Sequence, residues 1–220
     1  MQKNVIFAGP SGQLEGVLHL PDACSEPGQN KAPRAFAVVA HPLPTMGGTM
    51  ENKVVTTLAK AFAELGFAAL RFNFRGVGNS AGEFDSGNGE VADVLSVVRH
   101  AQDEFGHLPL ILAGFSFGGY VQARAAQHLH PQPHRLVLVA PAVGRSVPSF
   151  EKSTSMPHVP HNTLLIHGEQ DEVVPLAEVM DWARPQHLPI VVLPGAEHFF
   201  HGRLHQIKQL VLQDFHGQRL

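Results

Sequence analysis

The stretch "LAGFSFGG" (112–119) decides the fold, because an apolar run ends there at a serine with glycine on both sides. The run before it is typical of a strand, and residues 117–129 are typical of a helix, so Ser116 stands at the corner between them. Gly114 and Gly118 flank this corner, where a Cβ would strike the neighbouring strand and helix. A strand, G-x-S-x-G and a helix indicate a nucleophile elbow, which holds its serine in a strained conformation. Taken alone, the stretch also fits a tight turn with an incidental serine.

Strand-like and helix-like segments alternate along the rest of the chain. The strand-like segments are 13–20, 34–40, 67–74, 108–114, 134–140, 162–168 and 189–195. The helix-like segments are 52–66, 90–106, 117–129, 175–183 and 202–216. This alternation predicts a mostly parallel sheet of about seven or eight strands with helices on both faces, and antiparallel strands at the beginning. The parallel strands should all end at one edge of the sheet, where sites form. Residues 22–33 are predicted as a polar hairpin loop.

The composition indicates an ordinary globular protein, with 44% hydrophobic and 16% charged residues among 220. The formal charge is −3 and there is no cluster of Lys and Arg, so we expect no nucleic-acid partner. The N-terminus lacks the apolar core of a signal peptide, and no stretch approaches the roughly 18 apolar residues of a membrane span. Cys24 is the one cysteine and is expected to be a surface thiol. We therefore expect a cytoplasmic protein without a membrane partner.

Two later strand ends offer the base and the acid that a serine nucleophile needs. Asp171 follows the strand-like segment that ends at residue 168, and His198 follows the next one along the chain. The order serine, acid, histidine is the order of elbow hydrolases. Glu169 is the alternative acid and His201 the alternative base, and Asp171 also fits a helix cap. We expect Glu197, beside His198, to be a solvated loop residue.

The stretch "HPLPTMGGTM" (41–50) follows a predicted central strand and is the expected site of an oxyanion donor. The N–H of Leu43 should point inward, because the prolines on either side have no N–H. The second expected donor is the N–H of Phe117, at the start of the helix after the serine. His41 is expected to form hydrogen bonds within the loop. The two glycines either admit the substrate closely or bend the loop.

These motifs resemble those of the α/β-hydrolase fold. More narrowly, they resemble small bacterial serine hydrolases without a cap, which include esterases and dienelactone-hydrolase-like proteins. The matching strings stand at 41–55, 74–90, 114–121 and 195–204. The resemblance extends over nearly the whole chain and implies one α/β-hydrolase domain over residues 1–220, without a large cap. It departs from the wider superfamily at Asn73, where Asp is common before the Arg-Gly turn.

Together these residues predict a serine carboxylesterase in which Ser116 attacks, His198 carries the proton and Asp171 orients His198. No metal or organic cofactor is implied. The connection 141–161 is too short for a helical lid, so we expect an open site for short-chain acyl esters. The candidate apolar walls of that site are Met46, Phe150, Met156, Phe199 and Phe200. A thioesterase, lactonase, peptidase or non-catalytic binding protein would fit the same scaffold, and a homodimer is compatible with it.

Two further groups of residues have structural interpretations. Arg75 is expected to form an ion pair with Glu90 or Asp93 rather than with a substrate carboxylate. The triplet 128–130, with two histidines, lacks the ligand spacing of a metal site and is expected at a solvated helix end.

Overall fold

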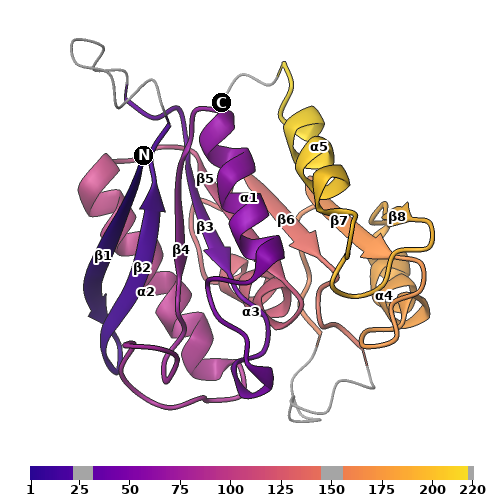
Figure 1. The fold of residues 1–220 in the computed structure, drawn as a ribbon, viewed down its shortest axis with the longest axis horizontal. Helices are drawn as coiled ribbons and strands as arrows, with labels where there is room; N and C mark the ends of the chain where they lie inside the picture. The colour runs from indigo at the N-terminus through magenta and orange to yellow at the C-terminus, as the bar shows by residue number, and fades with distance from the viewer. Residues whose placement is uncertain (22–31, 145–155, 218–220) are drawn as a thin grey trace.

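The computed structural model describes residues 1–21, 32–144 and 156–217, which build one eight-stranded sheet covered by helices (Figure 1). The strands are β1 (Gln2–Gly9), β2 (Gly12–His19), β3 (Phe36–Ala40), β4 (Ala68–Phe72), β5 (Leu110–Phe115), β6 (Arg135–Val139), β7 (Thr163–Gly168) and β8 (Val191–Leu193). The α-helices are α1 (Lys53–Glu64), α2 (Asn88–Phe105), α3 (Phe117–Ala126), α4 (Leu176–Ala183) and α5 (Leu204–Asp214). Two 3₁₀ turns are η2 (Pro44–Met46) and η3 (Arg184–Gln186).

The strand order across the sheet is β1-β2-β4-β3-β5-β6-β7-β8. β1 pairs antiparallel with β2, β2 pairs antiparallel with β4, and the pairs from β4 to β8 are parallel. The predicted mostly parallel sheet with antiparallel first strands is therefore confirmed. β1 was not among the expected strands, because its apolar residues at 5–8 are consecutive and do not alternate with polar ones. Only the face of Val5 and Phe7 packs against the core, and Ile6 on the other face is exposed.

The predicted hairpin loop at 22–33 is wrong. These residues connect β2 to β3, and β4 lies between those two strands in the sheet. The tight hairpin is formed by β1 and β2. Gln2 pairs with His19 at its open end, and Gly9 pairs with Gly12 next to the turn. Residues 22–31, with Cys24, lie outside the described part of the chain.

The two faces of the sheet carry separate apolar cores. Side chains alternate along each strand, so Val38 of β3 faces one core and Val39 faces the other. The first core contains buried side chains of α2, α3 and α4, and the second contains those of α1 and α5. Figure 1 shows α1 and α5 in front of the sheet and α2 behind it. Helices on both faces, as predicted, leave only the strand ends open for a site.

Local signals at the helix ends explain where the helices begin and end. α1 begins at Lys53 because the side chain of Asn52 accepts a hydrogen bond from the N–H of Val54 at 2.9 Å. The helix predicted over 117–129 ends at Ala126, since the following N–H groups turn to i−3 carbonyls. Among the described residues, no helix combines the length and apolarity needed to cross a membrane.

Candidate active site

Ser116 occupies the corner between β5 and α3 with φ +54° and ψ −120°. A positive φ is unfavourable for a residue with a side chain and costs about 1–3 kcal/mol, so the surroundings must hold it. The N–H of Ser116 donates to the carbonyl of Val139 at 3.0 Å, and its carbonyl accepts from the N–H groups of Tyr120 and Ala142. The backbone on both sides of the corner is thus fixed to β6 and α3.

The glycines around the serine are required by close backbone contacts. A Cβ on Gly114 would lie 2.4 Å from the carbonyl carbon of Gly118, and one on Gly118 would lie 2.4 Å from the carbonyl oxygen of Ala40. Real Cβ atoms do not approach other atoms so closely. The steric interpretation of the two glycines is therefore confirmed. Gly119 is less crowded, with Pro141 at 3.1 Å from the Cβ position.

A chain of hydrogen bonds joins Ser116, His198 and Asp171. Nδ1 of His198 lies 2.7 Å from Oδ2 of Asp171, and Nε2 lies 3.1 Å from Oγ of Ser116. Because a carboxylate only accepts, the proton of the neutral ring is on Nδ1, and Nε2 is left to accept from the serine hydroxyl. The three side chains come from the ends of β5, β7 and β8, and each residue is less than a tenth exposed. Residues separated by 55 and 27 positions in the sequence thus meet at one edge of the sheet.

The buried carboxylate of Asp171 is well supplied with donors. Its Oδ1 accepts from the N–H groups of Val173 at 3.0 Å and Val174 at 2.7 Å, which leaves Oδ2 for His198. These bonds compensate for the loss of water around a buried charge. Asp171 does not cap α4, because both N–H groups it holds lie in the loop before that helix.

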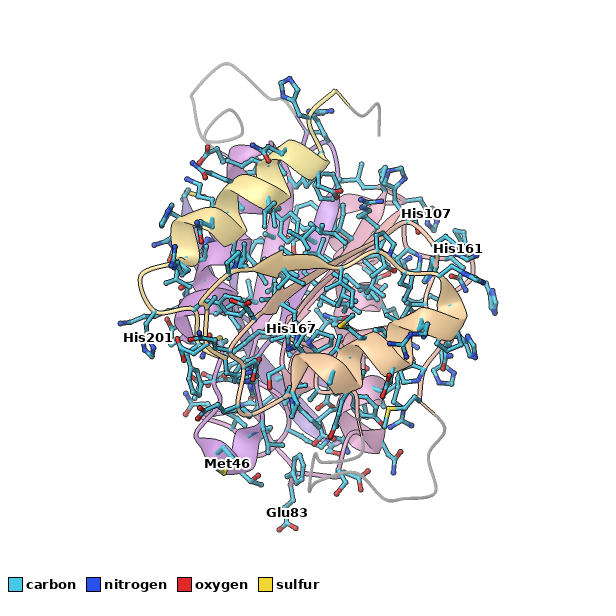
Figure 2. All side chains as sticks on the ribbon, turned by 90° about the vertical axis from the view of Figure 1, so that its right-hand side faces the viewer. Met46, Glu83, His107, His161, His167 and His201 are labelled. Atoms are coloured by element: carbon cyan, nitrogen blue, oxygen red, sulfur yellow. The ribbon has the colours of Figure 1, made fainter. Side chains whose placement is uncertain are left out.

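His167 is a functional candidate that the sequence analysis missed. It is fully buried at the end of β7, and its Nε2 donates to the carbonyl of Val174 at 2.9 Å and lies 3.4 Å from Oδ2 of Asp171. Burial lowers the pKa of His167, so the ring is neutral. Figure 2 shows it in the interior, between the strands and α4. The available signal was one histidine in an otherwise apolar strand, four residues before Asp171.

The alternative acid and base have other partners. Oε2 of Glu169 accepts from the N–H of Gly195 at 2.8 Å, and Nδ1 of His201 lies 2.9 Å from Oε1 of Glu197. His201 projects from the surface in Figure 2. Glu197 is a partly solvated loop residue, as expected, with its side chain 43% exposed, and it also accepts from the backbone N–H groups of Phe199 and His201. Glu197 therefore orders the loop that carries His198.

The loop after β3 lies directly against the elbow. A Cβ on Gly118 would be 2.5 Å from the carbonyl oxygen of His41, so the backbone of the loop touches the first turn of α3. The N–H groups of Met46 and Gly48 donate to the carbonyl of Leu43 at 3.1 and 3.0 Å. Nδ1 of His41 donates to the carbonyl of Pro42 at 2.7 Å, which confirms the expected hydrogen bond within the loop.

The candidate apolar walls differ in where their side chains lie. Phe199 is 48% exposed with its ring 5.1 Å from that of His198, and Met46 is 83% exposed at the lower end of the molecule in Figure 2. Phe200 is wrong as a wall, because it is fully buried and packs against Phe115 beneath the site. Met156 is half-buried and packs against the core that contains α2, α3 and α4. Phe150 lies outside the described residues.

Arg75 is a structural residue, as expected, and its partner is Asp93. Nη2 of Arg75 lies 2.8 Å from Oδ1 of Asp93 and 2.7 Å from the carbonyl oxygen of Gly89. Glu90 instead accepts from the N–H groups of Asp85 and Gly87. Within 1–21, 32–144 and 156–217, no three His, Cys, Asp or Glu side chains are grouped as they would be around a metal ion.

The sheet order and the strand–serine–helix corner define an α/β hydrolase. Residues 32–158 match the family model described as "Serine aminopeptidase, S33". An α/β serine hydrolase homologue from Coxiella burnetii is similar, with 40% identity, a TM-score of 0.81 and 96% of each chain covered. A protein from Xanthomonas campestris, described as an α/β serine hydrolase without lid, is 38% identical with a TM-score of 0.84, over 97% of this chain and 93% of that one. An uncharacterized protein of Rickettsia prowazekii is 28% identical over 94% of this chain and 86% of its own length. This chain therefore belongs to the α/β serine hydrolase family.

Proposed function

We propose that this protein is a serine carboxylesterase that works through an acyl-enzyme intermediate. The observation that carries the proposal is the unbroken hydrogen-bond chain from Ser116 Oγ through His198 to Asp171. Ser116 attacks the ester carbonyl while His198 takes its proton on Nε2, and Asp171 stabilises the imidazolium that forms. His198 then protonates the leaving alcohol, and water repeats the sequence to release the acid. These steps need no cofactor, because the side chains carry both the nucleophile and the proton.

The negative charge that develops on the carbonyl oxygen is stabilised by two backbone N–H groups. Phe117 is the first residue of α3, where the helix dipole favours negative charge. Leu43 lies in the loop that packs against the same helix turn. Each such donor contributes a factor of roughly 100–1,000 to kcat in hydrolases of this kind.

Short-chain acyl esters are the proposed substrates. β6 ends at Val139 and β7 begins at Thr163, which leaves little chain for a cap over the site. The relative from Xanthomonas campestris is described as lacking a lid. The exposed ring of Phe199 beside His198 offers an apolar surface to a small acyl group. A clear preference for acyl chains longer than about ten carbons would contradict this assignment, because such chains need a long enclosed apolar pocket.

Amide hydrolysis is the second candidate function. The matching family model is described by a serine aminopeptidase activity, and the same nucleophile, base and acid serve both reactions. Aminoacyl p-nitroanilides assayed beside p-nitrophenyl acetate, butyrate and decanoate, and beside acyl-thioesters, separate the candidates. The highest kcat/KM on a short p-nitrophenyl ester is expected.

Covalent labelling tests whether Ser116 is a nucleophile at all. A fluorophosphonate probe should modify the wild-type protein at Ser116, and the variant Ser116→Ala should neither be labelled nor hydrolyse esters. Intact-protein mass spectrometry with peptide mapping identifies the modified residue. A folded wild-type protein that resists labelling would favour a binding protein on the hydrolase scaffold.

A further inference from the structure

We propose that His41 and Gly48 are positioning residues that hold the peptide group between Pro42 and Leu43, and so aim the N–H of Leu43 at the substrate carbonyl oxygen. This inference rests on the proposed function, because the N–H has this task only if Ser116 attacks a carbonyl group. Neither residue touches the reacting atoms. Both residues act on the N–H of Leu43 through the peptide group between Pro42 and Leu43.

The hydrogen bond from His41 fixes the direction of the Leu43 N–H. Nδ1 of His41 donates to the carbonyl oxygen of Pro42 at 2.7 Å. That oxygen and the N–H of Leu43 belong to one planar trans peptide group, in which they point in opposite directions. Holding the oxygen therefore orients the N–H. A hydrogen bond to the oxygen also polarises the peptide group, which strengthens its N–H as a donor.

The ring of His41 is itself held at both nitrogens. Nε2 accepts from the backbone N–H of Phe74 at 3.1 Å, and the ring centroid lies 4.7 Å from that of Phe74. His41 is fully buried, and burial lowers its pKa to about 4, so the ring stays neutral at pH 7. The ring cannot turn without losing one of its two bonds. It serves as a fixed bridge from the end of β4 to the loop after β3.

Gly48 confines the same peptide group from the other side. A Cβ on Gly48 would lie 2.1 Å from the carbonyl oxygen of Pro42 and 2.7 Å from that of Leu43. The N–H of Gly48 donates to the carbonyl of Leu43 at 3.0 Å, so the next peptide group is held as well. Gly47, by contrast, has φ +78° and open space at its Cβ position. Gly48 thus allows the loop to bend closely onto its own backbone, which is one of the two interpretations of the glycine pair.

The loop is also fixed relative to the other proposed donor. The Cβ position of Gly118 lies 2.4 Å from the carbonyl oxygen of Ala40 and 2.5 Å from that of His41. Gly118 follows Phe117 directly, so the backbone that leads into Pro42 is packed on the turn that carries the first N–H. Two donors held on one packed backbone contact need no rearrangement when the charge develops.

Three substitutions of His41 separate positioning from plain structural support. The amide nitrogen of His41→Asn replaces Nδ1 and still donates to Pro42, whereas His41→Gln places its amide near Nε2 and His41→Ala has neither group. We expect His41→Asn to keep kcat within several-fold of wild type, and His41→Gln and His41→Ala to lower it by roughly 100-fold with little change in KM. Inhibition by a trifluoromethyl ketone, which forms a tetrahedral oxyanion with a serine, should weaken in parallel with kcat.

Gly48→Ala provides a second variant that leaves the imidazole in place. It should lower kcat and weaken ketone inhibition as His41→Ala does, while the neighbouring Gly47→Asn should retain both, because Asn tolerates a positive φ and its Cβ meets open space. Thermal unfolding of each variant identifies those that fail to fold. Equal losses of kcat in His41→Asn, His41→Gln and His41→Ala, or unchanged ketone inhibition in Gly48→Ala, would overturn the inference.

The outcomes also separate this inference from the proposed function. If wild-type protein hydrolyses esters and Ser116 is labelled, but the His41 and Gly48 variants behave as wild type, only the positioning role is wrong. If wild-type protein shows neither reaction, the proposed function is wrong and the positioning role is wrong with it.

Discussion

His167 contacts Asp171 on the oxygen that serves His198. Nε2 of His167 lies 3.4 Å from Oδ2 of Asp171, and Nδ1 of His198 lies 2.7 Å from the same atom. The main bond of His167 is to the carbonyl of Val174 at 2.9 Å, and its Nδ1 has no hydrogen-bond partner among the described residues. A neutral, fully buried ring thus supports the loop in which Asp171 lies.

His167→Leu should lower kcat by roughly 10–100-fold with KM nearly unchanged, because the carbonyl of Val174 loses its donor and Asp171 moves from its place. His167→Gln keeps an amide donor near Nε2 and should retain most of the activity. Steady-state kinetics on a short p-nitrophenyl ester, with the unfolding temperature as control, measures both. Equal losses in the two variants would contradict a role through the Val174 hydrogen bond.

Asp171→Asn should lower kcat by about 10⁴-fold, since an amide cannot hold His198 in the tautomer that accepts from Ser116. Glu169→Gln is the matched control in the same loop and should change kcat less than about tenfold, because the carboxylate of Glu169 accepts from the N–H of Gly195 and takes no part in the Ser116–His198–Asp171 chain. A larger effect of Glu169→Gln than of Asp171→Asn would reassign the acid.

The neighbouring residues Phe199 and Phe200 should respond to alanine in opposite ways. Phe200→Ala should reduce the free energy of unfolding by about 3–5 kcal/mol, because the ring is fully buried. Phe199→Ala should leave stability within about 1 kcal/mol of wild type and raise KM for short esters, since its ring is 48% exposed beside His198. Urea unfolding and ester kinetics on both variants test this pair, and an unchanged KM in Phe199→Ala would remove Phe199 from the substrate surface.

Gly118→Ala should prevent folding or reduce the free energy of unfolding by more than about 4 kcal/mol. Its Cβ would lie 2.4 Å from the carbonyl oxygen of Ala40, the last residue of the central strand β3. Gly119→Ala should cost only about 1–2 kcal/mol, since the nearest atom to its Cβ is Pro141 at 3.1 Å and a shift of a few tenths of an ångström relieves the contact. Soluble yield and unfolding temperature compare the two. Similar stability in both variants would argue against the tight packing of the elbow on β3.

Two buried histidines should make stability depend on pH between about 6.5 and 4. Burial, with the charge of Arg71 added at His19, lowers the pKa of both His19 and His41 to about 4. The unfolded chain therefore takes up protons in this range that the folded protein does not, so stability falls as the pH falls. Each group contributes up to about 3 kcal/mol of this loss.

His19→Gln isolates one of the two contributions, because glutamine does not titrate and its oxygen still accepts from Nε of Arg71. Urea unfolding at pH 7 and pH 5 should show a smaller pH dependence in the variant than in the wild-type protein. An identical dependence in both proteins would mean that His19 takes up its proton equally in the folded and unfolded states.

Much of the fold was predictable because its signals are local. Apolar runs of strand length alternate with amphipathic helices, and these repeat often enough to predict a mostly parallel sheet. Strand β1, which was not predicted, lies at the edge of the sheet. The hairpin predicted at 22–33 is wrong because β2 and β3 are not neighbours: β4 lies between them. Which strands pair is set by contacts between distant segments, and such contacts have no local sequence pattern.

The sequence by itself determined the corner at Ser116 and the order in which Asp171 and His198 follow it, because steric demands at a turn and positions after strands are local properties. Only the tertiary structure decided that His167 contacts Asp171, that Gly48 confines Pro42, and that Phe200 is buried while Phe199 is exposed. Each of these depends on how strand ends and loops distant along the chain pack against one another, and that packing is a property of the folded sheet as a whole.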